Sequence, residues 1–190
     1  MSLIALGTVA LDHVKTPSGV KKDMLGGSVA HFAMSARLFT KVHLVAVVGK
    51  DFPQKYIRHL EQRGIDLTSL VVSKEKTFRW RGEYNQADLN TAVTLETVLG
   101  ALLNYVPQIA EHQRDLPNVF LANFDPDIQN KLLDLMRKPR LVGLDSMNLW
   151  INDKLKRKLL LNLMQRVNLF VANDAEARGH RKARGTTGQL

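Results

Sequence analysis

Five short runs of apolar, largely β-branched residues constrain the fold of this chain most strongly. They predict strands at 3–9, 42–48, 119–123, 141–145 and 167–172. Runs this continuous are typical of strands that are buried on both faces of a sheet. The segments between them carry apolar residues at helical spacing. Strands that alternate with helices in this way predict parallel βαβ units, and therefore an α/β layered fold with a mostly parallel sheet.

Start and stop signals for the helices agree with this alternation. Asp125 precedes a proline, which places an N-cap residue before the first helical position. Gly64 follows a helix predicted over 53–63, where helices commonly end in a left-handed residue. A later helix is predicted to begin at 152–153. Its buried stripe is predicted to be Leu155, Leu159 and Leu163.

Residues 77–84 have a different character, because Phe78, Trp80 and Tyr84 alternate with charged residues. Strict alternation predicts a strand with one apolar and one polar face, not a central strand of a parallel sheet. We expect an antiparallel flap that is separate from the main sheet. The polar segment 85–97 that follows is predicted to be irregular.

A glycine pair, Gly26-Gly27, opens a helix whose apolar stripe is Val29, Phe32, Ala33 and Ala36. Without side chains, the two glycines let a ligand approach the helix N-terminus, where free N–H groups are expected to point outward. An isolated Gly-Gly is more often only a tight turn, and that alternative remains open at this stage.

Polar residues follow several of the predicted strands. Ligands of open α/β sheets gather beyond the carboxyl ends of the strands. The candidate site residues at these positions are Asp12, Asn123, Asp145, Asn173 and Glu176. Each one alone could be a helix cap or a turn residue. For Asn123 and Asp145 that structural role explains the residue about as well as a role in a ligand site.

Several classes of protein are disfavoured by what the sequence lacks. There is no Gly-x-Gly-x-x-Gly, no P-loop and no Gly-x-Ser-x-Gly elbow. There is no cysteine, and the six histidines are scattered, which argues against disulfides and a zinc site. No apolar run approaches the roughly 20 residues of a membrane helix. These features fit a cytoplasmic protein that does not contact a membrane.

The net charge of +9 raises the possibility of a nucleic-acid partner. Four basic residues and no acidic one lie in 178–190, which leaves +5 for the rest of the chain. We therefore expect no specific nucleic-acid binding. The segment 178–190 has no apolar period and is predicted to be a basic, disordered tail after a domain at 1–177.

The stretch from Gly26-Gly27 through the alanine-rich helix and the strand to Val48-Gly49-Lys50-Asp51 resembles the signature of the PfkB (ribokinase-like) family of sugar and nucleoside kinases. The resemblance covers 3–177. It implies a Rossmann-type layered fold with a small β lid, whose strands would lie at about 10–24 and 77–96. It also implies transfer of the γ-phosphoryl group of ATP to a sugar hydroxyl, with magnesium.

The resemblance also implies roles for particular residues. Asp12, Gly26 and Gly27 match positions that bind the sugar or nucleoside. His31 falls where ribokinases carry Asn. The Asn-x-x-Glu motif of the family, associated with magnesium and phosphate, matches Asn173 and Glu176, with Glu176 holding the metal through water. In this family the lid often pairs two subunits, so a lid-mediated homodimer is expected.

The family pattern continues into a Gly-Ala-Gly-Asp segment that supplies the catalytic base and the anion hole, and the sequence contains no such segment. We therefore expect the C-terminal part of the fold to be missing and the chain alone to be inactive. Asp145 is the only nearby candidate for a substitute base, and the sequence supports it weakly. The alternative function is a non-catalytic sugar-binding or regulatory protein, and a nucleic-acid binder ranks third.

Overall fold

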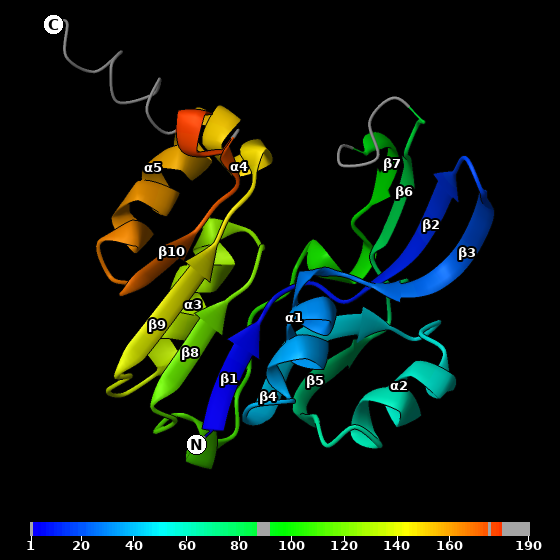
Figure 1. Cartoon of the computed structure of the whole chain (residues 1–190). Helices are drawn as coiled ribbons and strands as arrows, with labels where there is room; N and C mark the ends of the chain where they lie inside the picture. Colours follow the sequence, from blue (N-terminus) through cyan, green and yellow to red (C-terminus); the bar gives the residue numbers. More distant parts are fainter. Residues whose placement is uncertain (1, 87–91, 175, 180–190) are drawn as a thin grey trace, which may run out of the picture.

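Two β-sheets organise the chain (Figure 1). In this computed structural model, residues 2–86, 92–174 and 176–179 are described. The larger sheet has the order β10-β9-β8-β1-β4-β5, and every one of its strand pairs is parallel. Its strands are β1 (Ser2–Leu6), β4 (Lys41–Gly49), β5 (Asp66–Ser73), β8 (Asn118–Leu121), β9 (Leu141–Asp145) and β10 (Leu169–Val171). The predicted α/β fold with a mostly parallel sheet is confirmed.

Helices cover both faces of this sheet. They are α1 (Ser28–Ala36), α2 (Gln54–Glu61), α3 (Pro126–Leu135), α4 (Asn148–Asn152) and α5 (Lys154–Met164), with short 3-10 turns η1 (Gly100–Leu102) and η2 (Glu111–Gln113). Successive strand residues point to opposite faces. Thus Ile4 and Leu6 join one core cluster with residues of α3 and α5, whereas Ala5 joins a second cluster with residues of α1 and α2.

Two local predictions are wrong. A strand, β7 (Val93–Val98), occupies part of the segment that was predicted to be irregular. The stripe of α5 is shifted, because Leu155 is 67% exposed while Leu160 and Leu163 are fully buried. The Asp153 side chain caps α5 by accepting from the backbone N–H of Lys156, as expected for a helix that begins there.

The smaller sheet is a lid that stands beside the carboxyl ends of the larger one (Figure 1). It has the order β3-β2-β6-β7 and includes β2 (Ala10–Thr16), β3 (Gly19–Gly26) and β6 (Arg79–Glu83). The β2–β3 and β6–β7 pairs are antiparallel, but β2 and β6 run parallel, so the flap is not wholly antiparallel. Phe78 and Trp80 are half-buried, whereas Arg81 is exposed and pairs with Glu96 at 3.3 Å.

The base of the lid is held by Asp51, the last residue of the Val-Gly-x-Asp stretch. One carboxylate oxygen accepts from the backbone N–H and the hydroxyl of Thr77 at 2.7 and 2.8 Å, and the other accepts from Arg79 at 3.0 Å. Burial alone would raise the pKa of Asp51, but these hydrogen bonds outweigh it and lower the pKa. The stretch therefore joins the end of β4 to the start of β6.

The described residues contain no helix that is both long and apolar enough to cross a bilayer. Of the predicted tail, Arg178 and Gly179 are helical, so helix continues two residues past the expected domain end at 177. The rest of that segment, 180–190, lies outside the described residues.

Candidate functional site

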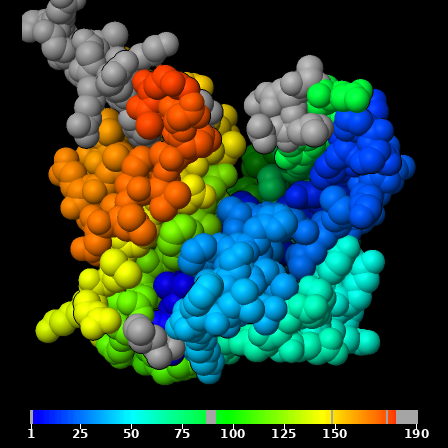
Figure 2. Space-filling view, in the orientation of Figure 1, coloured from blue at the N-terminus to red at the C-terminus, as the bar shows by residue number. Residues whose placement is uncertain are grey.

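A cleft of about 1510 Å³ lies between the lid and the carboxyl ends of the large sheet. Figure 2 shows the molecule hollowed between the blue and green lid strands and the yellow-to-orange half. The strand order reverses at β1, which pairs with β4 on one side and β8 on the other. Crevices form at such switch points, because the connections leave on opposite faces. The polar residues that follow β8, β9 and β10 therefore converge here.

Asp12 lines the cleft, but not at a strand end as predicted. It lies within β2, opposite Met24 of β3 and Trp80 of β6. Trp80 in turn lies opposite Thr97 of β7, so Asp12, Trp80 and Thr97 form one row across the inner face of the lid. Burial raises the pKa of Asp12 to about 6, and the nearby His31 opposes this rise.

Gly26 does not line the cleft; it makes room for Asp12. A Cβ atom at Gly26 would lie 1.9 Å from Oδ2 of Asp12. The absent side chain thus lets the carboxylate lie over the backbone of β3. Of the predicted substrate-binding residues, Asp12, Gly27 and His31 are brought together in the cleft, and Gly26 supports them from behind.

Gly27 is the N-cap of α1 and has a φ of 95°. It approaches the chain after β1 so closely that a Cβ atom would lie 2.3 Å from the carbonyl oxygen of Thr8. The expectation of free N–H groups at this helix N-terminus is wrong for Ser28 and Val29. The Ser28 N–H donates to the hydroxyl of Thr8 at 3.0 Å, and the Val29 N–H donates to the carbonyl of Thr8 at 3.2 Å.

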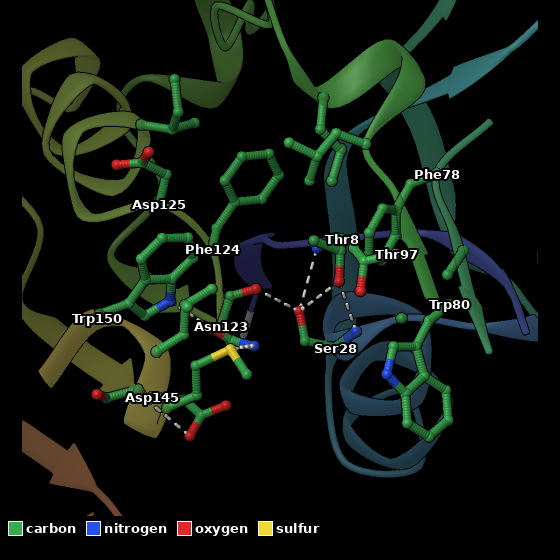
Figure 3. A pocket seen from close by; sticks show the side chains of 18 of the residues that line it. Thr8, Ser28, Phe78, Trp80, Thr97, Asn123, Phe124, Asp125, Asp145 and Trp150 are labelled. Atoms are coloured by element: carbon green, nitrogen blue, oxygen red, sulfur yellow. Dashed lines mark hydrogen bonds between the residues drawn. The ribbon is translucent and has the colours of Figure 1, made fainter. Parts of the chain in front are cut away.

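Ser28 links three segments at the floor of the cleft (Figure 3). Its hydroxyl accepts from the backbone N–H of Thr8 at 3.1 Å and donates to the carbonyl of Asn123 at 2.8 Å. The ends of β1 and β8 and the start of α1 are therefore fixed to one another. No sequence pattern indicates this role, because a serine after Gly-Gly has many ordinary explanations.

Asn123 lies in the cleft, but its side chain is already engaged. Its Oδ1 accepts from Nε1 of Trp150 at 2.8 Å, and its Nδ2 donates to Sδ of Met147 at 3.0 Å (Figure 3). These bonds tie the end of β8 to the segment after β9. In this arrangement Asn123 organises the wall of the cleft, and Trp150 contributes an aromatic ring to it.

Asp145 and Glu176 form an acidic end of the cleft. Burial raises the pKa of both carboxyl groups, and the charge of Asp145 adds to the rise at Glu176. The N–H of Ser146 donates to Asp145 at 2.9 Å. Asn173 and Glu176 also bond reciprocally, because each side chain accepts from the other's backbone N–H, at 2.9 and 3.0 Å. That is capping-box geometry, and it leaves one oxygen of Glu176 without a bond in this pair.

The rest of the cleft is largely apolar and aromatic. Phe78 and Trp80 come from the lid, whereas Phe124 and Tyr105 pack against each other at 5.9 Å between ring centroids. Burial raises the pKa of Tyr105 well above its usual range. On the far wall, Lys156 pairs with Asp125 at 2.6 Å, and the sequence did not single out this pair.

The fluorescence of Trp80 can show whether a ligand binds against the lid. Its indole lies over Gly82, where a Cβ atom would come within 2.1 Å of the ring, and its Nε1 donates to Thr94 at 3.1 Å. In a Trp150→Phe background, ligand binding is expected to change Trp80 emission, since a ligand in the cleft displaces water from the ring. Steady-state fluorescence during a nucleoside titration measures this. An unchanged spectrum at saturation, with binding shown by calorimetry, would place the ligand away from the lid.

A cleft at the carboxyl ends of a parallel sheet, covered by a small β lid that carries a carboxylate, is typical of the small-molecule sites of lidded α/β folds. The chain belongs to the pfkB family of carbohydrate kinases, whose family model matches residues 4–188. The resemblance found in the motifs is thereby confirmed.

The chain is similar to a cytidine kinase of Thermococcus kodakarensis, with 28% identity over 179 residues, 93% of this chain and 63% of that protein. Its fold matches the Methanocaldococcus jannaschii nucleoside kinase, an archaeal member of the ribokinase family, with a TM-score of 0.69 and 20% identity over 93% of this chain and 62% of that one. It also matches ribokinase from Cryptococcus neoformans in complex with ADP, with a TM-score of 0.62 and 20% identity over 75% and 50% of the two chains. The chain thus spans less than two thirds of the length of these proteins.

Proposed function

We propose that this chain carries the substrate-binding part of an ATP-dependent nucleoside kinase. The observation that carries the proposal is the row of Asp12, Trp80 and Thr97 on the inner face of the lid, opposite the ends of β8 and β9. A carboxylate beside an aromatic ring suits a ligand that has both hydroxyl groups and a flat apolar face. Asp12 accepts hydrogen bonds from ribose hydroxyls, and charge-assisted bonds of this kind are the strong ones.

A nucleoside fits this cleft better than a free sugar. A single sugar ring uses hydroxyl contacts, whereas the walls here also offer Phe78, Trp80 and Phe124. Such rings stack on a nucleobase, because every base has a π-face. The nucleoside and cytidine kinases among the similar proteins support the same substrate class.

The acidic end suits a magnesium ion. Asp145 and Glu176 are like charges whose pKa values are raised by burial, so a cation beside them relieves their repulsion. No group of three or more His, Cys, Asp or Glu side chains that could hold a metal occurs in the described part of the chain. Two carboxylates are enough for magnesium, which keeps several waters. When bound, the ion would neutralise phosphate charge, with Glu176 reaching it through water and Asn173 fixing Glu176.

Turnover by the 190 residues alone is expected to be absent at kinase-like rates. The sequence has no Gly-Ala-Gly-Asp segment, and a general base contributes typically 10²–10⁴-fold. The assay follows ADP formation with ATP, magnesium and a panel of sugars and nucleosides, with the Thermococcus cytidine kinase as the positive control. Turnover comparable to that control would mean that the base lies inside this chain, and Asp145 would be the first residue to replace.

A non-catalytic, nucleoside-binding protein is the second candidate, because a formed cleft supports binding whether or not turnover follows. Both candidates bind the same ligand, and only turnover separates them. A homodimer through the lid remains part of the proposal, because β7 at the edge of the lid is exposed at every residue, including Val93 and Leu95.

A further inference from the structure

Gln129 lies on the side of α3 that faces the sheet, with only 1% of its surface exposed. Its Nε2 donates to the carbonyl oxygen of Ala122 at 3.0 Å and to that of Asp145 at 3.3 Å. A third, longer contact reaches the carbonyl of Leu121 at 3.5 Å. One buried amide therefore bridges the carboxyl ends of two neighbouring strands.

These two carbonyls lie just beyond the end of the β8–β9 ladder, although Asp145 still pairs with Val171 of β10 on its other side. The last register pair between β8 and β9 is Leu121 with Leu144, so Ala122 and Asp145 come directly after it. A buried carbonyl beyond the end of a ladder needs another donor. The Nε2 group of Gln129 supplies that donor to both strands at once. It therefore takes the place of the next backbone hydrogen bonds between β8 and β9.

The residues that Gln129 fixes carry the wall and the acidic end of the cleft. Asn123 follows Ala122, and Asp145 itself contributes a carboxylate. From the opposite face, the hydroxyl of Ser28 holds the carbonyl of Asn123 at 2.8 Å. The chain after β8 is thus held by hydrogen bonds from one side chain of α1, Ser28, and one of α3, Gln129.

We propose that Gln129 is a positioning residue, which holds the ends of β8 and β9 so that Asn123 and Asp145 face the ligand. The identity of that ligand rests on the proposed function, but the positioning does not. The role needs the donating NH₂ group: within the described residues, Oε1 of Gln129 has no hydrogen-bond partner. Gln129→Met keeps the length of the side chain and removes the donor. Gln129→Glu keeps the shape of the side chain but replaces the NH₂ donor by a carboxylate oxygen, which cannot donate to the two carbonyls.

Amide hydrogen exchange measured by NMR tests the role at the residues concerned. The N–H of Ser146 donates to the carboxylate of Asp145 at 2.9 Å, and Asn123 directly follows the Ala122 carbonyl that Gln129 holds, so the exchange rates of these two amides report on this geometry. In Gln129→Met we expect both to exchange about tenfold faster, the factor that corresponds to one lost neutral hydrogen bond. In Gln129→Glu we expect the exchange rates of both amides to rise by more than tenfold. Amides of β4 should stay as they are in the parent chain.

Leu132→Met is the matched control, since Leu132 lies on the same helix, is fully buried and keeps its volume when replaced. It is expected to lower the melting temperature without releasing the ends of β8 and β9. Nucleoside affinity is expected to fall several-fold in Gln129→Met and to stay unchanged in Leu132→Met. If both variants give the same exchange at Asn123 and Ser146, the role is merely structural and the proposal is overturned. If the parent chain binds no nucleoside, the proposed function fails, and the exchange result still decides the role of Gln129.

Discussion

Replacing Asp12 by asparagine is expected to weaken nucleoside binding by about one to two orders of magnitude. The carboxylate lines the cleft over Gly26, in the row with Trp80 and Thr97. Losing a hydrogen bond to a charged acceptor costs roughly 1.5–3 kcal/mol, which is the source of that range. Isothermal titration calorimetry at pH 8 measures the effect. Asp134→Asn is the control, because Asp134 is exposed on α3 and pairs with Arg166 at 2.7 Å.

The same substitution is expected to stabilise the folded chain above pH 6. The pKa of Asp12 rises from 3.8 to about 6 on folding, so between these values the folded state retains a proton that the unfolded state has released. Stability therefore falls as pH rises through this window and stays reduced above it. For a partly solvated group the reduction is about 1–2 kcal/mol after solvent screening.

Asparagine removes this titration. Thermal unfolding should therefore give a higher melting temperature for Asp12→Asn than for the parent chain at pH 8, and a much smaller difference at pH 4. A variant that is less stable at pH 8 while still binding nucleoside normally would show that Asp12 is a structural residue and not a ligand-binding one.

Gly27→Ala is expected to cost about 3–5 kcal/mol of folding stability, at the upper end for single substitutions. Two effects add. The φ of 95° disfavours any side chain, and the new Cβ atom would lie 2.3 Å from a backbone carbonyl that cannot move without shifting the end of β1. Urea unfolding followed by circular dichroism measures the loss.

Gly64→Ala separates the two effects. Gly64 also has a positive φ, of 74°, but a Cβ atom there would meet nothing within 4 Å. It should lose only about 1–2 kcal/mol, the ordinary cost of the left-handed region. Equal losses in the two variants would contradict the close approach of Gly27 to Thr8, on which the floor of the cleft depends.

The sequence predicted the large sheet well because its strands are buried on both faces. Between Val42 and Val48, β4 carries only one polar residue, His43. Its apolar run is therefore easy to recognise in the sequence. The residue pattern missed β7, which only the resemblance implied, because this strand is exposed throughout and carries Thr94 and Glu96. In α5 the expected stripe included Leu155, although the helix turns Leu160 and Leu163 to the core and Leu155 to solvent.

The candidate site was predictable only in part. Residues after strands β8, β9 and β10 converge because parallel strands end at one edge. The residue pattern placed Asp12 just beyond a strand at 3–9, and only the family resemblance, with lid strands at about 10–24, implied the strand β2 in which it lies. Ser28 and Gln129 act on backbone carbonyls of distant segments, and such contacts leave no local pattern in a sequence.

The central claim is that the cleft under the lid binds a nucleoside, and calorimetry with the parent chain tests it most directly. Cytidine, inosine and free ribose are titrated separately into the 190-residue chain at pH 8. The account predicts saturable one-site binding of at least one nucleoside, tighter than that of ribose and lost in Asp12→Asn. No heat from either nucleoside at millimolar concentration, or binding of ribose alone with equal strength in Asp12→Asn, would contradict it.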